Sequence, residues 1–132
     1  MKYVLGTRSK QRLTGLHPDL VAVVELAITK TDVDFTVLEG MRTRTRQRSL
    51  YTKGSSMTMN SRHLTGHAVD LGAYVDGEVK WDWPLYHRIA KVVTGSHSLM
   101  GLTISYVGAR TRRNCLAGRE LDDRKYRIRT KN

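Results

Sequence analysis

The segment from Ser61 to Leu71 constrains this chain most, because a histidine near its start and a carboxylate near its end flank a glycine. In a β-strand, successive side chains point to opposite faces, so Asp70 shares one face with the small residues Gly66 and Ala68. The other face of the same strand is mostly apolar, which predicts contact with a core. Asp70 therefore projects over an uncrowded surface, where an ion and its bound water have room.

His63 lies before this strand, and Thr65–Gly66 allow the chain to turn and bring its imidazole toward Asp70. One nitrogen and one oxygen ligand suit zinc, which takes three protein ligands in catalytic sites and keeps a fourth position for water. We interpret the pair as two of the three ligands of a hydrolytic zinc site. The alternative is a buried His–Asp hydrogen bond that is purely structural. Strand alternation directs His67 away from Asp70, so we expect His67 in the core or behind the ligands.

A longer pattern resembles a known family. The run Ser-x-His-x-x-Gly-x-Ala-x-Asp is filled by Ser61, His63, Gly66, Ala68 and Asp70. It resembles the main motif of the zinc D,D-carboxypeptidase and L-alanyl-D-glutamate endopeptidase family. The chain is most similar to the single-domain phage endolysins that cut the peptide stems of peptidoglycan. Further similar blocks are residues 1–9 with 17–20, residues 34–42 with Arg46–Gln47, and residues 79–83. The resemblance covers roughly residues 1–104.

This resemblance implies a zinc cofactor, peptidoglycan stem peptides as substrate, and metal-assisted amide hydrolysis. Arg42 occupies the position where the family places an arginine facing the scissile carbonyl, and its charge would stabilise the developing oxyanion. The alternative is that Arg42, like Arg44, Arg46 and Arg48, lies on the solvated face of a helix; we favour solvation for the last three. Ser61 is expected to bind substrate backbone or to orient His63, and a plain loop cap is the other interpretation.

The C-terminus departs from the family pattern. Family members close the site with a Trp-Gly-Gly-Asp-Trp-like strand and an Asp-x-x-His element that supplies the third ligand and the general base. No histidine follows His97 here, and the nearest similar run, Asp123–Tyr126, has the acid but Tyr in place of the ligand. Asp123 is therefore our candidate acid/base, with Glu120 and Asp122 as alternatives and Glu39 as a weaker one, and we expect Cys115 to be inert. With two zinc ligands, we expect weak or absent activity.

Charge is concentrated at the C-terminus. The net charge is +11, and residues 110–132 carry 9 Lys or Arg against 3 Asp or Glu. We expect a peptidase-like domain over residues 1–109, followed by a basic, solvated and poorly ordered tail that could bind an anionic envelope surface. Charge alone also suggests nucleic-acid binding, but the tail offers only Tyr126 as an interleaved aromatic. A second alternative is an inactive module that binds peptidoglycan without cleaving it.

Hydrophobic periodicity predicts a single α+β domain with a small antiparallel sheet packed against helices. The resemblance implies that this domain is of the zinc D-Ala-D-Ala peptidase type. Apolar residues recur at helical spacing after Pro18, which can open a helix at its first turn. Further helices are predicted at 43–51 and 84–99, and strands at 33–38, 67–74 and 102–107.

The single cysteine excludes an internal disulfide. No apolar run approaches the length of a membrane span, and the N-terminus lacks an export pattern. We expect a monomer that stays in the host cytoplasm until lysis and then acts on the cell wall.

Overall fold

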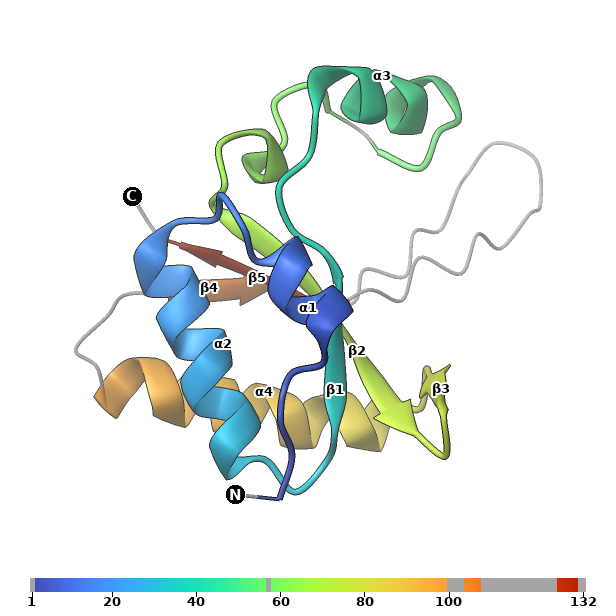
Figure 1. Ribbon diagram of the computed structural model, residues 1–132. Helices are drawn as coiled ribbons and strands as arrows, with labels where there is room; N and C mark the ends of the chain where they lie inside the picture. Colours follow the sequence, from blue (N-terminus) through green and yellow to red (C-terminus); the bar gives the residue numbers. More distant parts are fainter. Residues whose placement is uncertain (1, 57, 100–103, 108–125, 131–132) are drawn as a thin grey trace.

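The computed structural model describes residues 2–56, 58–99, 104–107 and 126–130 (Figure 1). The helices of this described part are α1 (Thr7–Arg12), α2 (Pro18–Lys30), α3 (Arg44–Thr52), the short 3-10 helix η1 (Arg62–Leu64) and α4 (Trp83–Leu99). Its strands are β1 (Phe35–Glu39), β2 (Ala68–Val75), β3 (Glu78–Lys80), β4 (Ile104–Val107) and β5 (Tyr126–Thr130). The predicted α+β class is confirmed.

Strand β2 is at the centre of one antiparallel sheet with the order β1-β2-β5-β4. The short strand β3 folds back on the end of β2 as a hairpin. Its turn has positive φ at both central residues, 53° at Asp76 and 81° at Gly77. Two consecutive left-handed residues match the right-handed twist of the flanking strands, so Asp-Gly is a favoured hairpin pair.

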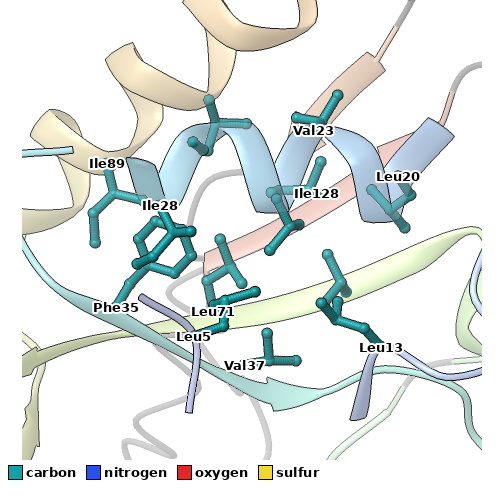
Figure 2. Packing of buried hydrophobic residues seen from close by; sticks show 14 of the residues in the cluster. Leu5, Leu13, Leu20, Val23, Ile28, Phe35, Val37, Leu71, Ile89 and Ile128 are labelled. Carbon is teal, nitrogen blue, oxygen red and sulfur yellow. The ribbon is translucent and has the colours of Figure 1, made fainter. Parts of the chain in front are cut away.

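The core lies between helices α2 and α4 on one side and strands β1, β2 and β5 on the other (Figure 2). Helix α2 begins with Pro18, and the His17 Nδ1 atom accepts a hydrogen bond from the Asp19 backbone N–H at 3.2 Å. The predicted apolar stripe of α2 is fully buried: Leu20, Val23, Val24 and Ala27. Helix α4 contributes Ile89 and Val93, which are also fully buried.

Strand β2 separates the core from the candidate site. Val69 and Leu71 are fully buried members of the core cluster, so alternation directs Asp70 to the opposite face of the sheet. His67 is half-buried and lies outside the core cluster, so its expected place in the core is wrong, whereas its place behind the ligands stays a prediction. The strand begins only at Ala68, so strand alternation does not govern His67. Its Nδ1 atom is 2.8 Å from Thr65 Oγ1, and its ring lies 5.2 Å from that of His17.

The structure also differs from the expected division at residue 109. Strand β5 lies in the segment that we treated as a tail, and it pairs with both β2 and β4. Ile128 is fully buried in the core cluster. The strand predicted at 102–107 is therefore not the last one, and the folded sheet includes residues 126–130. Residues 108–125, on which much of the tail prediction falls, lie outside the described part of the chain.

Candidate metal centre

The local turn between His63 and Asp70 brings their side chains together. His63 lies in η1, where the Ser61 Oγ accepts a hydrogen bond from the His63 backbone N–H at 3.3 Å. Gly66 then adopts φ +76°, which reverses the chain into β2. As a result, His63 Nε2 lies 3.3 Å from Asp70 Oδ1, and both side chains are fully buried.

The Nε2 side of the His63 ring faces Asp70. Its Nδ1 atom lies 2.7 Å from the Gly40 carbonyl oxygen, which can only accept, so Nδ1 carries the proton. In the neutral ring, Nε2 is then unprotonated. This buried Nε2 has no hydrogen-bond partner among the described residues. This contact between Nε2 and a carboxylate oxygen away from water is favourable only when a proton or a metal cation lies between the two atoms.

The separation of the two atoms fits a shared zinc ion. In a tetrahedral site with Zn–N and Zn–O bonds of about 2.0–2.2 Å, two ligand atoms lie about 3.3–3.5 Å apart. The observed 3.3 Å between His63 Nε2 and Asp70 Oδ1 falls in that range. Within the described ranges, no third His, Cys, Asp or Glu joins this pair. The described part of the chain therefore supplies two protein ligands of types that suit zinc.

Arg42 lies next to Asp70 of this pair. Its Nε and Nη2 atoms donate to the two Glu39 carboxylate oxygens at 3.0 and 2.7 Å, a bidentate ion pair. Its Nη1 atom donates to Gln47 Oε1 at 2.7 Å, and Nη2 is 3.9 Å from Asp70 Oδ2. Only 4% of Arg42 is exposed. The N–H groups of the guanidinium therefore donate to protein partners.

Arg42 also holds the loop that carries His63. Its backbone N–H donates to the His63 carbonyl at 2.9 Å, and its Nη1 atom is 3.5 Å from Ser61 Oγ. Since Gly40 binds the His63 ring, the segment from Gly40 to Arg42 fixes both the backbone and the side chain of this histidine. Such contacts around a metal ligand orient it and tune its basicity.

Glu39 is ionised in this setting. Burial raises the pKa of its carboxyl, but the hydrogen bonds and the charge of Arg42 outweigh burial and hold that pKa below its ordinary value. Arg46 adds a more distant contact, with its Nε atom 3.5 Å from Glu39 Oε1. Glu39 is thus a partner of Arg42, which makes it a poor candidate for the acid/base role.

The end of α1 and the loop that follows it pack against Gly40 and Gly66. A Cβ atom at Gly40 would lie 1.9 Å from the Arg12 carbonyl oxygen, and one at Gly66 would lie 2.7 Å from the Gly15 carbonyl oxygen. The His17 backbone N–H donates to the Gly66 carbonyl at 2.8 Å. Only glycine permits these close approaches, so the site depends on a loop far from it in sequence.

Comparison with known proteins decides the family. The family model of the phage L-alanyl-D-glutamate peptidases matches residues 1–127. This chain belongs to that family. It is 26% identical over 110 residues to the L-alanyl-D-glutamate peptidase of Escherichia phage T5, and the match covers 80% of each protein. It also resembles the L-Ala D-Glu endopeptidase ChiX of Serratia marcescens, with a TM-score of 0.79 and 36% identity over 98% of this chain and 92% of that one.

Membership in this L-alanyl-D-glutamate peptidase family confirms the resemblance and extends it. The similar blocks end near residue 104, whereas the family match continues to residue 127 and reaches β5. The C-terminal residues at which this sequence departs from the family pattern are therefore part of the matched region. The family consists of peptidases, so the expected enzyme class is confirmed.

The structure brings together four of the five residues predicted for this peptidase site: Arg42, Ser61, His63 and Asp70. Asp123 lies outside the described residues, as do Cys115, Glu120 and Asp122. Arg44, Arg46 and Arg48 are exposed on α3, as expected. Sequence reasoning assigned no role to Gln47. Its position within a similar block was the one signal that pointed to it.

Proposed function

We propose that this chain is a zinc-dependent endolysin that hydrolyses the bond between L-alanine and D-glutamate in peptidoglycan stem peptides. The observation that carries the proposal is the buried His63 Nε2 atom, 3.3 Å from Asp70 Oδ1 and without a hydrogen-bond partner among the described residues. The names of the phage T5 peptidase and of ChiX support the choice of bond. His63 and Asp70 are the proposed zinc ligands.

Zinc bound at this pair would act as a Lewis acid and lower the pKa of its water to about 7. The residues of the chain hold the pair in place for that chemistry. The Gly40 carbonyl fixes the tautomer of His63, and the Ser61 hydroxyl holds the His63 backbone, which favours the orienting role of Ser61 over substrate binding.

Arg42 brings a positive charge close to Asp70, with 3.9 Å between Nη2 and Oδ2. We keep the predicted role of Arg42 in stabilising the oxyanion. Because Glu39, Gln47 and Ser61 engage its N–H groups, it would act through its charge rather than by a direct hydrogen bond. Asp123 remains the proposed group that passes a proton to the leaving amine.

The experiment measures zinc stoichiometry and affinity together with the release of new amino termini from purified peptidoglycan. With two ligands rather than three, we expect weak zinc binding and slow release, because even losses around a metal ligand can cost about 10- to 100-fold in affinity. Tight one-to-one zinc binding with rapid release would contradict the low activity and indicate a third ligand. Capture on peptidoglycan with no release at any zinc concentration would contradict hydrolysis and favour a binding module.

We further propose that the enzyme acts as a monomer, stays in the host cytoplasm until lysis, and then meets the cell wall. Within the described residues, no helix has the length and apolar character needed to cross a membrane. Contact of the basic C-terminal segment with an anionic envelope surface remains part of the proposal, since residues 110–132 carry much of the net charge.

A further inference from the structure

Gln47 is a fully buried amide that joins α3 to the metal centre. Its Oε1 atom accepts a hydrogen bond from Arg42 Nη1 at 2.7 Å. Its Nε2 atom donates to Ser56 Oγ at 2.8 Å and to the Thr58 carbonyl oxygen. One side chain therefore contacts both the guanidinium behind Asp70 and the loop that leads to His63.

Helix α3 depends on few buried residues for its position. Figure 1 shows this helix at the top of the molecule, apart from the packed pair α2 and α4. Among its nine residues, Gln47 and Leu50 are buried. Leu50 holds the start of the following loop through its backbone, because its carbonyl accepts from the N–H groups of Ser55 and Ser56 at 2.9 and 3.1 Å. Gln47 holds the next part of that loop, at Thr58.

Only an amide satisfies both sides of this contact. The Arg42 guanidinium requires an acceptor, whereas the Thr58 carbonyl requires a donor. A glutamate at position 47 would accept from Arg42 but would turn its second oxygen toward the Thr58 carbonyl. A methionine would fill a similar volume and make neither hydrogen bond. The chemistry of the site thus selects glutamine rather than any buried side chain of its size.

We propose that Gln47 is a positioning residue of the metal centre, which sets Arg42 relative to Ser56 and to residues 58–61, so that His63 faces Asp70. This inference rests on the proposed zinc peptidase function. Gln47 does not contact the pair itself. It acts through Arg42, whose backbone N–H holds the His63 carbonyl, and through the loop that ends at Ser61.

The test compares Gln47→Glu with Gln11→Glu in the full chain. Gln11 is the matched control, because it is an exposed glutamine on α1. Titration with zinc alone should show an affinity about 10-fold or more lower for Gln47→Glu and unchanged for Gln11→Glu. On peptidoglycan, kcat should fall while KM changes little, as expected for a residue that does not bind substrate. A Gln47→Glu variant with wild-type zinc affinity would overturn the proposal.

Two further measurements keep the test decisive. If Gln47→Glu fails to fold, Ser56→Ala provides a second variant, because it removes one hydrogen-bond partner of the Gln47 amide. Zinc affinity should then fall, but by less than in Gln47→Glu. Unchanged zinc affinity in folded Ser56→Ala would overturn the proposal. If the wild type binds no zinc, the proposed function fails. Hydrogen exchange of the His63 amide then decides the positioning role: faster exchange in Gln47→Glu than in Gln11→Glu supports it, and equal rates overturn it.

Discussion

At the scale of single residues, the site is a small buried set of charges. Glu39 and Asp70 are negative, Arg42 is positive, and His63 is neutral when Nδ1 alone carries a proton. Two carboxylates flank the one guanidinium of this set, and Asp70 is fully buried. Moving a carboxylate out of water costs free energy, so the metal-free site is less stable than its packing suggests. A divalent cation between His63 and Asp70 would offset the charge of the Asp70 carboxylate.

This charge balance predicts that Asp70→Asn separates metal binding from stability. The new amide removes one buried negative charge and can donate to His63 Nε2, so the metal-free variant should be as stable as the wild type or about 0.5–1.5 kcal/mol more stable. Zinc binding should be lost. Urea denaturation in a chelator and zinc titration measure the two effects. A metal-free variant that is markedly less stable than the wild type would contradict the assigned charges.

A second residue-scale prediction concerns Gly40. A Cβ atom there would lie 1.9 Å from the backbone oxygen of Arg12, and no side-chain rotation can relieve contact with backbone. Gly40→Ala should therefore cost about 3 kcal/mol or more in unfolding free energy. Gly95→Ala is the control, since a Cβ at this exposed position in α4 meets nothing within 4 Å, and it should gain about 0.5–1 kcal/mol. Similar effects of the two substitutions on denaturant midpoints would refute the close approach.

At the scale of elements, β2 connects the site to the core, and Tyr86 of α4 fixes one end of this strand. Its hydroxyl donates to the Lys80 carbonyl at 2.7 Å and accepts from the Ala73 N–H at 3.0 Å. The ring stacks on Trp81, with 5.9 Å between centroids. Tyr86 therefore holds β2, the end of β3 and α4 together.

Tyr86→Phe should cost about 1–3 kcal/mol in unfolding free energy, because the Ala73 N–H loses its acceptor.

The same substitution should also change how stability depends on pH in the alkaline range. Burial raises the pKa of the Tyr86 hydroxyl above its ordinary value of 10.0, so its contribution is complete below pH 10 and is lost as the pH rises through the higher folded-state value. Unfolding midpoints measured across this range should fall with pH by a smaller amount in the variant than in the wild type. Parallel curves would contradict this role.

Helices and strands could be predicted where the local sequence pattern agrees with the packing in the fold. Helix α2 could be predicted because its buried residues recur at helical spacing. Helix α1 was missed because its sequence has no apolar stripe. Its place depends on β1, where Ser9 Oγ accepts from the Val37 N–H at 3.0 Å and Arg12 Nη1 donates to the Val37 carbonyl at 2.8 Å. Such contacts between distant segments are not visible in local periodicity.

The same distinction applies to the site. His63 and Asp70 could be predicted because they are close in the sequence. Only one turn and the start of one strand separate them. The contacts of Glu39 and Gln47 with Arg42 join β1, α3 and the intervening loop, so they appear only after these elements pack. Strand β5 was missed because its basic residues indicated a solvated tail, while its pairing partner β2 lies far earlier in the chain. Asp123 stays a prediction.

At the scale of the whole molecule, β5 makes the C-terminus part of the folded unit. Ile128 is fully buried between the sheet and the helices, and α2 packs close to this strand (Figure 2). Ile128→Ala should cost about 2–5 kcal/mol, as expected for a buried isoleucine. Val4→Ala is the control, because Val4 is 68% exposed, and it should change the unfolding free energy by less than about 0.5 kcal/mol. Equal, small effects would show that residues 126–130 do not contribute to the core.

The central claim is that His63 and Asp70 bind one and the same zinc ion. Isothermal titration of the metal-free protein with zinc, run in parallel on the wild type, His63→Gln and Asp70→Asn, tests it most directly. We predict one zinc per chain in the wild type and loss of that site in each variant, because neither side chain alone retains a pair of ligands. Zinc binding of unchanged stoichiometry and affinity in either variant would contradict the claim.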